Sequence, residues 1–205
     1  MADTNFVALS GSVNKWGHTP PSGTTKWHRF WILTHLDNIQ IDYGGKPLVL
    51  EDQKLFLSVK IGESETQKKI LYAVKQRLDH HLGAYFIATD ATLGSYWSKK
   101  KKTEVFELSV GLSNLRAFNE PRQPVNRVIL CGRVTSVSPG WIQVEERYRN
   151  PRGEGKDAWK SRKVWVYTAI QMAVQEGDQV YIEGKLAGKR PDGQEMLFVI
   201  AEKIS

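Results

Sequence analysis

The sequence is poor in the residues that cross-link a chain or perform catalysis. It contains one cysteine, Cys131, so an intramolecular disulfide is excluded and a reducing compartment is expected. It has no His-Glu-x-x-His motif, no Cys-x-x-Cys pair and no glycine loop that ends in Gly-Lys-Ser/Thr. His80 and His81 are adjacent and would point about 100° apart on a helix, which makes them a poor metal pair. We therefore expect no metal, no cofactor and no catalytic residue.

Long apolar runs are also missing. No segment approaches the roughly 18 consecutive apolar residues of a membrane-spanning helix, and the N-terminus does not combine a basic stretch with a long apolar one. We therefore expect a soluble, cytoplasmic protein with no membrane partner. The charge is unbalanced, since 29 Lys and Arg residues against 22 Asp and Glu residues give a formal net charge of +7. Such an excess suits a polyanionic ligand, but it is also common on proteins that bind nothing charged.

The spacing of apolar residues predicts five strands and one helix in the first part of the chain. The helix is predicted by apolar residues at helical spacing from Ile70 to Leu82. Ser64 and Gln67 resemble a capping box, and Gly83 is a suitable helix stop. The expected strands cover residues 5–13, 26–35, 54–61, 84–93 and 104–115, with an irregular connector over 36–53, the helix between the third and fourth strands, and a charged loop over 94–103.

The same order of elements then starts again. Residues 119–125 contain two prolines and no periodicity, so they are predicted to form a linker. Asn126–Val134 repeats Asn5–Val13, with Asn, Val, Leu, Gly and Val at identical spacing. The expected strands of this second copy cover residues 126–134, 140–149, 161–169, 178–186 and 196–204, with only a short segment, 170–177, in place of the helix.

Five strands with a helix between the third and the fourth is the element order of the OB-fold, a small Greek-key barrel. We therefore predict a mainly β protein of two tandem OB-fold barrels, in domains 1–118 and 126–205, with a longer helix in the first. Cys131 lies beside Gly132 within a predicted strand, so we expect a buried, inert thiol.

Alternation along the predicted strands places aromatic and cationic residues on the face opposite the core. If Val164 and Val166 point into the core, Lys163, Trp165 and Tyr167 share the other face. Aromatic side chains flanked by cations suit stacked bases and phosphates, and stacking is worth about 1–3 kcal/mol per base. Outward aromatics also occur in subunit interfaces or beneath loops. The same alternation selects Trp27, Arg29, Trp31, Phe56 and Lys60 in the first copy, and Lys185 in the second.

Two predicted loops are rich in cations. The hairpin between the second and third strands of the second copy is a candidate for phosphate contacts, and its Pro-Arg-Gly-Glu-Gly tip is expected to be mobile. Charged hairpins are also commonly just solvated. Trp141 follows Pro139-Gly140 at a strand start, where a structural role is expected. The hairpin candidates are Arg147, Tyr148, Arg149, Arg152, Lys156, Trp159, Lys160, Arg162 and Lys163, and the loop candidates of the first copy are Lys99, Lys100, Lys101 and Lys102.

Three stretches of the second copy resemble the bacterial single-stranded DNA-binding protein (SSB) family. NRVILCGRV (126–134) is similar to the opening strand of that family, and GDQVYIEGKL (177–186) matches its fourth strand. DGQE (192–195) stands where a loop of the family turns. The first copy is similar in outline only, and PPSGTTKWHRFWILTH (20–35) looks more like the primosomal PriB branch of the same fold.

The resemblance implies sequence-independent binding and protection of single-stranded DNA in replication, recombination or repair, by a non-enzymatic protein associated with the nucleoid. It also implies that the cationic hairpin closes over the DNA. A homodimer of such a tandem chain would supply four OB-folds. In the family, pairing uses the first strands, which would bring Cys131 close to its mate in the partner subunit.

The sequence departs from the family at its end. SSB proteins of bacteria usually end in a spacer and an acidic tip that recruits repair and replication enzymes, whereas this sequence stops at IAEKIS, directly after the last predicted strand. Replication or repair proteins would then be recruited by another surface. Two alternatives stay open: a PriB-like accessory protein that acts mainly through protein contacts, and an RNA-binding OB protein, because stacking faces accept DNA and RNA alike.

Overall fold

The structure is a computed structural model of the chain. It describes residues 6–18, 26–51, 53–61, 69, 72–73, 76–77, 85–98, 102–111, 115–118, 120, 123–149, 159–169, 173–189 and 195–205. Within these ranges, no helix is both long enough and apolar enough to cross a membrane.

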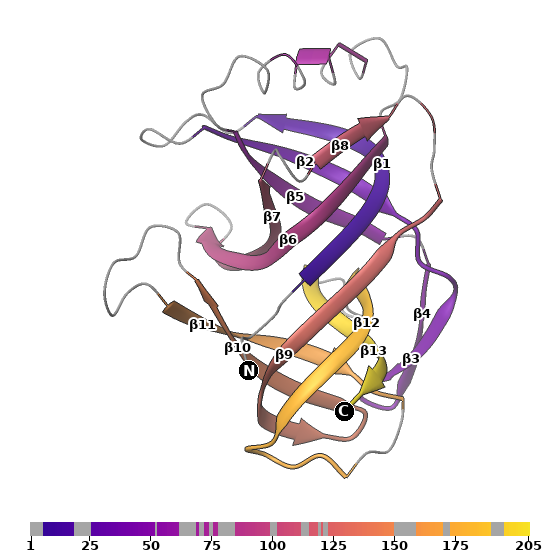
Figure 1. Cartoon of the computed structure of the whole chain (residues 1–205). Helices are drawn as coiled ribbons and strands as arrows, with labels where there is room; N and C mark the ends of the chain where they lie inside the picture. Colours follow the sequence, from indigo (N-terminus) through magenta and orange to yellow (C-terminus); the bar gives the residue numbers. More distant parts are fainter. Residues whose placement is uncertain are drawn as a thin grey trace.

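Strands dominate both halves of the chain (Figure 1). The first half contains β1 (Phe6–His18), β2 (Lys26–Thr34), β3 (Ile39–Tyr43), β4 (Lys46–Leu50), β5 (Gln53–Ile61), β6 (Tyr85–Ser98), β7 (Thr103–Gly111) and β8 (Leu115–Phe118). The second half contains β9 (Asn126–Ser138), β10 (Trp141–Arg149), β11 (Trp159–Tyr167), β12 (Gln179–Lys189) and β13 (Glu195–Ile204).

Each half closes into a five-stranded barrel. In the first half the strands follow the order β1-β2-β5-β7-β6, and β6 pairs again with β1. In the second half the order is β9-β10-β11-β13-β12, and β12 pairs again with β9. The β5–β7 and β11–β13 pairings are parallel and the other pairings within the barrels are antiparallel. This is the strand order of the OB-fold, so the predicted fold class is confirmed.

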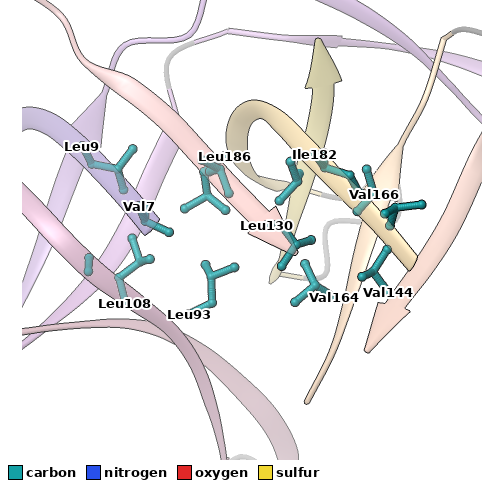
Figure 2. Packing of buried hydrophobic residues seen from close by; sticks show 14 of the residues in the cluster. Val7, Leu9, Leu93, Leu108, Leu130, Val144, Val164, Val166, Ile182 and Leu186 are labelled. Atoms are coloured by element: carbon teal, nitrogen blue, oxygen red, sulfur yellow. The ribbon is translucent and has the colours of Figure 1, made fainter. Parts of the chain in front are cut away.

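The two barrels are joined by their first strands. β1 pairs with β9 in antiparallel fashion, with Phe6 opposite Ile129 and Leu9 opposite Asn126. The apolar side chains on the inner faces of both barrels form one cluster, in which Leu186 lies near the middle (Figure 2). Pairing between the first strands, which the family resemblance implied for a dimer, therefore takes place within one chain over these residues.

The segment between β2 and β5 is not the irregular connector that was predicted over 36–53. β3 and β4 pair with each other as a separate two-stranded hairpin. Its turn holds Gly44 and Gly45 at φ values of 61° and 80°, the backbone of a tight type I′ turn, which side chains other than those of Gly and Asn rarely adopt. The Asp42 carboxylate accepts a hydrogen bond from the Gly45 N–H at 2.8 Å and stabilises this turn.

The lengths of other elements also differ from the prediction. β1 and β6 extend to His18 and Ser98, beyond the predicted strand ends, and β8 adds a strand that pairs with the beginning of β6. Within the predicted helix, every residue that the structure describes is helical: Lys69, Tyr72, Ala73, Gln76 and Arg77. The proposed capping residues Ser64 and Gln67 and the stop at Gly83 lie outside the described residues.

Candidate nucleic-acid interface

The candidate interface lies on the outer face of the β10–β11 hairpin. Val164 and Val166 point into the core at 6% and 0% exposure, as the alternation predicted. Their neighbours on the outer face stand opposite residues of β10 in a regular ladder. From the barrel end toward the hairpin tip, the opposed pairs are Trp141 with Tyr167, Gln143 with Trp165, Glu145 with Lys163 and Arg147 with Ser161.

The half of this face nearest the hairpin tip carries accessible cations beside a tryptophan. Lys163 and Arg147 are exposed, and Trp165 is half-buried. Arg133 of β9 is also exposed and stands opposite Glu145, which extends the basic surface by one strand. An indole on the same sheet face as three cations can stack a base and contact phosphates. Arg133 was not among the predicted binding residues, although the cross-strand ladder from Glu145 leads directly to it.

The opposite half of the face is covered, which corrects the prediction for Tyr167. Tyr167 is only 8% exposed, and its ring packs edge-on against Trp141 with ring centroids 5.2 Å apart. Leu36, Ile41 and Leu50 from the β3–β4 region belong to the same buried cluster. Tyr167 is therefore a packing residue and not part of an open stacking surface. The structural role predicted for Trp141 is confirmed, since it is 7% exposed.

The structure also corrects the prediction that Arg162 contacts phosphates. Its guanidinium Nε–H donates to the carboxylate of Glu146, which stands opposite it on β10 and is fully buried. Burial lowers the pKa of Arg162 to about 9. The alternation that places Val164 in the core also places Arg162 on the inner face, so this signal was available in the sequence. Arg162 thus fixes the base of the hairpin and does not extend the outer basic row.

Lys185 lies between two carboxylates, and this differs from the open position predicted for it. Its ammonium Nζ is 3.2 Å from Oδ2 of Asp37 and 3.3 Å from Oε1 of Glu202. Burial alone would lower the pKa of Lys185, but the hydrogen bonds to Asp37 and Glu202 outweigh it and raise this pKa. Lys185 therefore contributes to an ion-pair link between β12 and the segment that follows β2.

Several candidates are described only through their backbones. In the first barrel, Trp27 stands opposite Lys60, Trp31 stands opposite Phe56, and Arg29 lies between the two tryptophans on β2. Near the tip of the second-barrel hairpin, the backbone register pairs Tyr148 with Lys160 and Arg149 with Trp159. Their binding roles stay predictions. Lys102 is exposed directly before β7, and Lys99, Lys100, Lys101, Arg152 and Lys156 lie outside the described residues.

The lone thiol is less buried than predicted. Cys131 is half-buried on β9, where it stands opposite Tyr181 of β12. The described part of the chain contains no group of three or more His, Cys, Asp or Glu side chains that could hold a metal ion.

No protein-family model matches the chain, and no curated protein matches it. Among solved structures, the chain is similar to the wild-type single-stranded DNA-binding protein from Thermus aquaticus, with a TM-score of 0.57 and 15% sequence identity over 100% of this chain and 93% of that one. A deletion mutant of the Thermus aquaticus protein gives the same TM-score and identity, with 95% of its chain covered. At this identity the likeness shows a shared fold, and it extends over both barrels.

Proposed function

We propose that this chain binds single-stranded DNA without sequence preference and protects it during replication, recombination or repair. The observation that carries the proposal is the row formed by Trp165, Lys163 and Arg147 on the outer face of a closed OB barrel. The likeness of fold to a single-stranded DNA-binding protein and the net charge of +7 support it.

Binding on such a surface has two physical components. A base stacked on an aromatic side chain contributes about 1–3 kcal/mol whatever its identity, because every base has a flat face. Each phosphate neutralised by Lys or Arg releases a counterion and contributes roughly −0.7 to the slope of log affinity against log salt for a single strand. The ladder supplies both components at adjacent positions: Trp165 for stacking, and Lys163 and Arg147 for phosphates.

The proposal includes a homodimer. A single OB barrel offers a track of only about 4–16 nucleotides, and two chains would bring four barrels together. Because β1 and β9 already pair within the chain, the contact between subunits would use another surface. Replication or repair proteins would bind outside the DNA track.

Titration with oligo-dT, oligo-rU and duplex DNA, followed by tryptophan fluorescence, tests the proposed function. We expect tight binding to oligo-dT with quenching, weak binding to duplex DNA, and a steep loss of affinity with salt. Tighter binding to oligo-rU than to oligo-dT would assign the protein to RNA, and equal binding to both would contradict a preference for DNA. Weak binding to all three ligands would instead favour a PriB-like protein that acts through protein contacts.

A further inference from the structure

The β3–β4 hairpin belongs to the first half of the chain but packs on the outside of the second barrel (Figure 1). Leu36, Ile41 and Leu50 are 2%, 1% and 0% exposed, although the hairpin is separate from the main sheet. They share a cluster with five second-barrel residues: Trp141, Tyr167, Ala187, Phe198 and Ile200. Complete burial of three aliphatic side chains makes this contact part of the protein core.

Two hydrogen bonds fix the edge of the hairpin on the barrel. The indole Nε1–H of Trp141 donates to the backbone oxygen of Asp42 at 3.2 Å, and the Asp42 N–H donates to the hydroxyl of Tyr167 at 3.1 Å. Pro47 stands opposite Asp42 in the hairpin and has no N–H to offer. Both backbone groups of Asp42 are thus bonded to the second barrel, and the two aromatic side chains use their polar atoms in this contact.

The contact divides the outer face of β10 and β11. Trp141 and Tyr167 lie beneath the hairpin. In the next opposed pair, Gln143 and Trp165, the half-buried Trp165 still packs against the same cluster. Beyond that pair the face carries Lys163, which is exposed. The boundary between covered and open surface therefore falls at Trp165, which packs against the cluster and is still partly exposed.

We propose that the β3–β4 hairpin is a fixed stop at one end of the single-strand track on the second barrel. The inference rests on the proposed function and specifies the track: bases stack on Trp165 and continue toward Arg147, and they do not reach Trp141 or Tyr167. The hairpin stays docked when the strand is bound. Because the hairpin comes from the first barrel, the same contact fixes the orientation of that barrel relative to the end of the track.

Fluorine NMR of protein labelled with 5-fluorotryptophan tests where the track ends. The signals of Trp141 and Trp165 are assigned from the single variants Trp141→Phe and Trp165→Phe, and oligo-dT is then added to saturation. We expect the Trp165 signal to shift and the Trp141 signal to stay in place. Binding with a comparable shift of the Trp141 signal would overturn the stop and leave the proposed function intact. An absence of binding would overturn the proposed function, and the track with it.

Hydrogen exchange at the Asp42 amide tests whether the hairpin stays docked. This amide is bonded to the hydroxyl of Tyr167, so Tyr167→Phe should accelerate its exchange by roughly two- to tenfold, the equivalent of one hydrogen bond. Val49→Ser, at an exposed position of the same hairpin, is the matched control and should leave the rate unchanged. In the wild-type protein, saturating oligo-dT should not accelerate exchange at Asp42. Acceleration by the ligand would show that DNA displaces the hairpin and would overturn the proposal.

Discussion

Trp165 and Tyr167 are two residues apart on β11 and share its outer face, but their surroundings differ. Tyr167 is enclosed by Trp141 and the β3–β4 hairpin, and its hydroxyl accepts the Asp42 N–H. Trp165 packs against the same cluster but is only half-buried, and it stands one step from the exposed Lys163. Residue type and strand position are therefore insufficient to assign a role on this face, because the covering element decides it.

We expect Trp165→Ala and Tyr167→Ala to have opposite effects. Trp165→Ala should cost about 1–3 kcal/mol of oligo-dT binding, because a stacking surface is removed. It should cost less folding stability than Tyr167→Ala, because Trp165 is only half-buried. Tyr167→Ala should cost about 3–5 kcal/mol of stability, as a buried aromatic truncation does, while the folded fraction binds normally. Urea unfolding and fluorescence anisotropy of labelled oligo-dT measure the two quantities. If Trp165→Ala melts early and binds normally when cold, Trp165 is a packing residue.

The buried pair of Glu146 and Arg162 leads to a second prediction at this scale. Glu146→Ala would leave a buried cation without its carboxylate and should cost roughly 3–5 kcal/mol of stability. The double variant Glu146→Leu, Arg162→Met should recover most of that loss, because no buried charge remains. Lys163→Ala, an exposed change next to Arg162, is the control and should alter the free energy of unfolding by no more than about 0.5 kcal/mol. Chemical denaturation of the wild-type protein and the three variants measures their free energies of unfolding. A double variant no more stable than Glu146→Ala would contradict the stabilising role of the buried pair.

At the scale of elements, the five strands of each barrel were predictable and the position of the β3–β4 hairpin was not. Alternation is local, so it identified β11 and the inward direction of Val164 and Val166. The Gly44-Gly45 turn between two alternating segments was also a local signal for β3 and β4, which the predicted connector missed. Packing of that hairpin against Tyr167 is a contact between residues distant in the chain, and no periodicity within one strand reveals which element covers its face.

The ion pair between Asp37 and Lys185 makes the stability of this hairpin contact depend on pH. The hydrogen bond from Lys185, and then that from His35, lowers the pKa of Asp37 below its usual value of 3.8. A lowered acid pKa contributes stability that is present above pH 3.8 and lost as pH falls through the lowered value. Burial lowers the pKa of Lys185, but the hydrogen bonds to Asp37 and Glu202 raise it above its usual value of 10.5. A raised lysine pKa contributes stability that is present below pH 10.5 and is lost as the pH rises through the raised value.

We therefore expect Asp37→Asn to melt at a lower temperature than the wild-type protein at neutral pH. The difference should shrink below pH 3.8, where the wild-type carboxylate also becomes protonated. Thermal melts across pH measure this, with Glu176→Gln as a control at an exposed carboxylate elsewhere on the second barrel. A difference that is the same at acid and neutral pH would show that the charge of Asp37 does not stabilise the contact.

At the scale of the whole molecule, three contacts make the two barrels one structure. β1 pairs with β9, the inner faces share one apolar cluster, and the hairpin of the first barrel covers part of the second. The internal repeat of Asn5–Val13 in Asn126–Val134 indicated two copies of one fold. It left open whether the first strands would pair within a chain or between chains, because either arrangement satisfies the same edge hydrogen bonds.

The proposed homodimer is the prediction that belongs to this scale. The chain has a mass of 23.3 kDa and two barrels, so a twofold pair would have twice that mass and four barrels. Closed C₂ pairing is the commonest arrangement of identical subunits and requires one self-complementary surface. Since residues 6–9 and 126–129 pair with each other inside the chain, backbone pairing of these segments is not expected to hold the subunits together. Light scattering of the protein without DNA should give the dimer mass at micromolar concentration. A monomer mass there would contradict the four-barrel arrangement and would favour an accessory protein that acts through other partners.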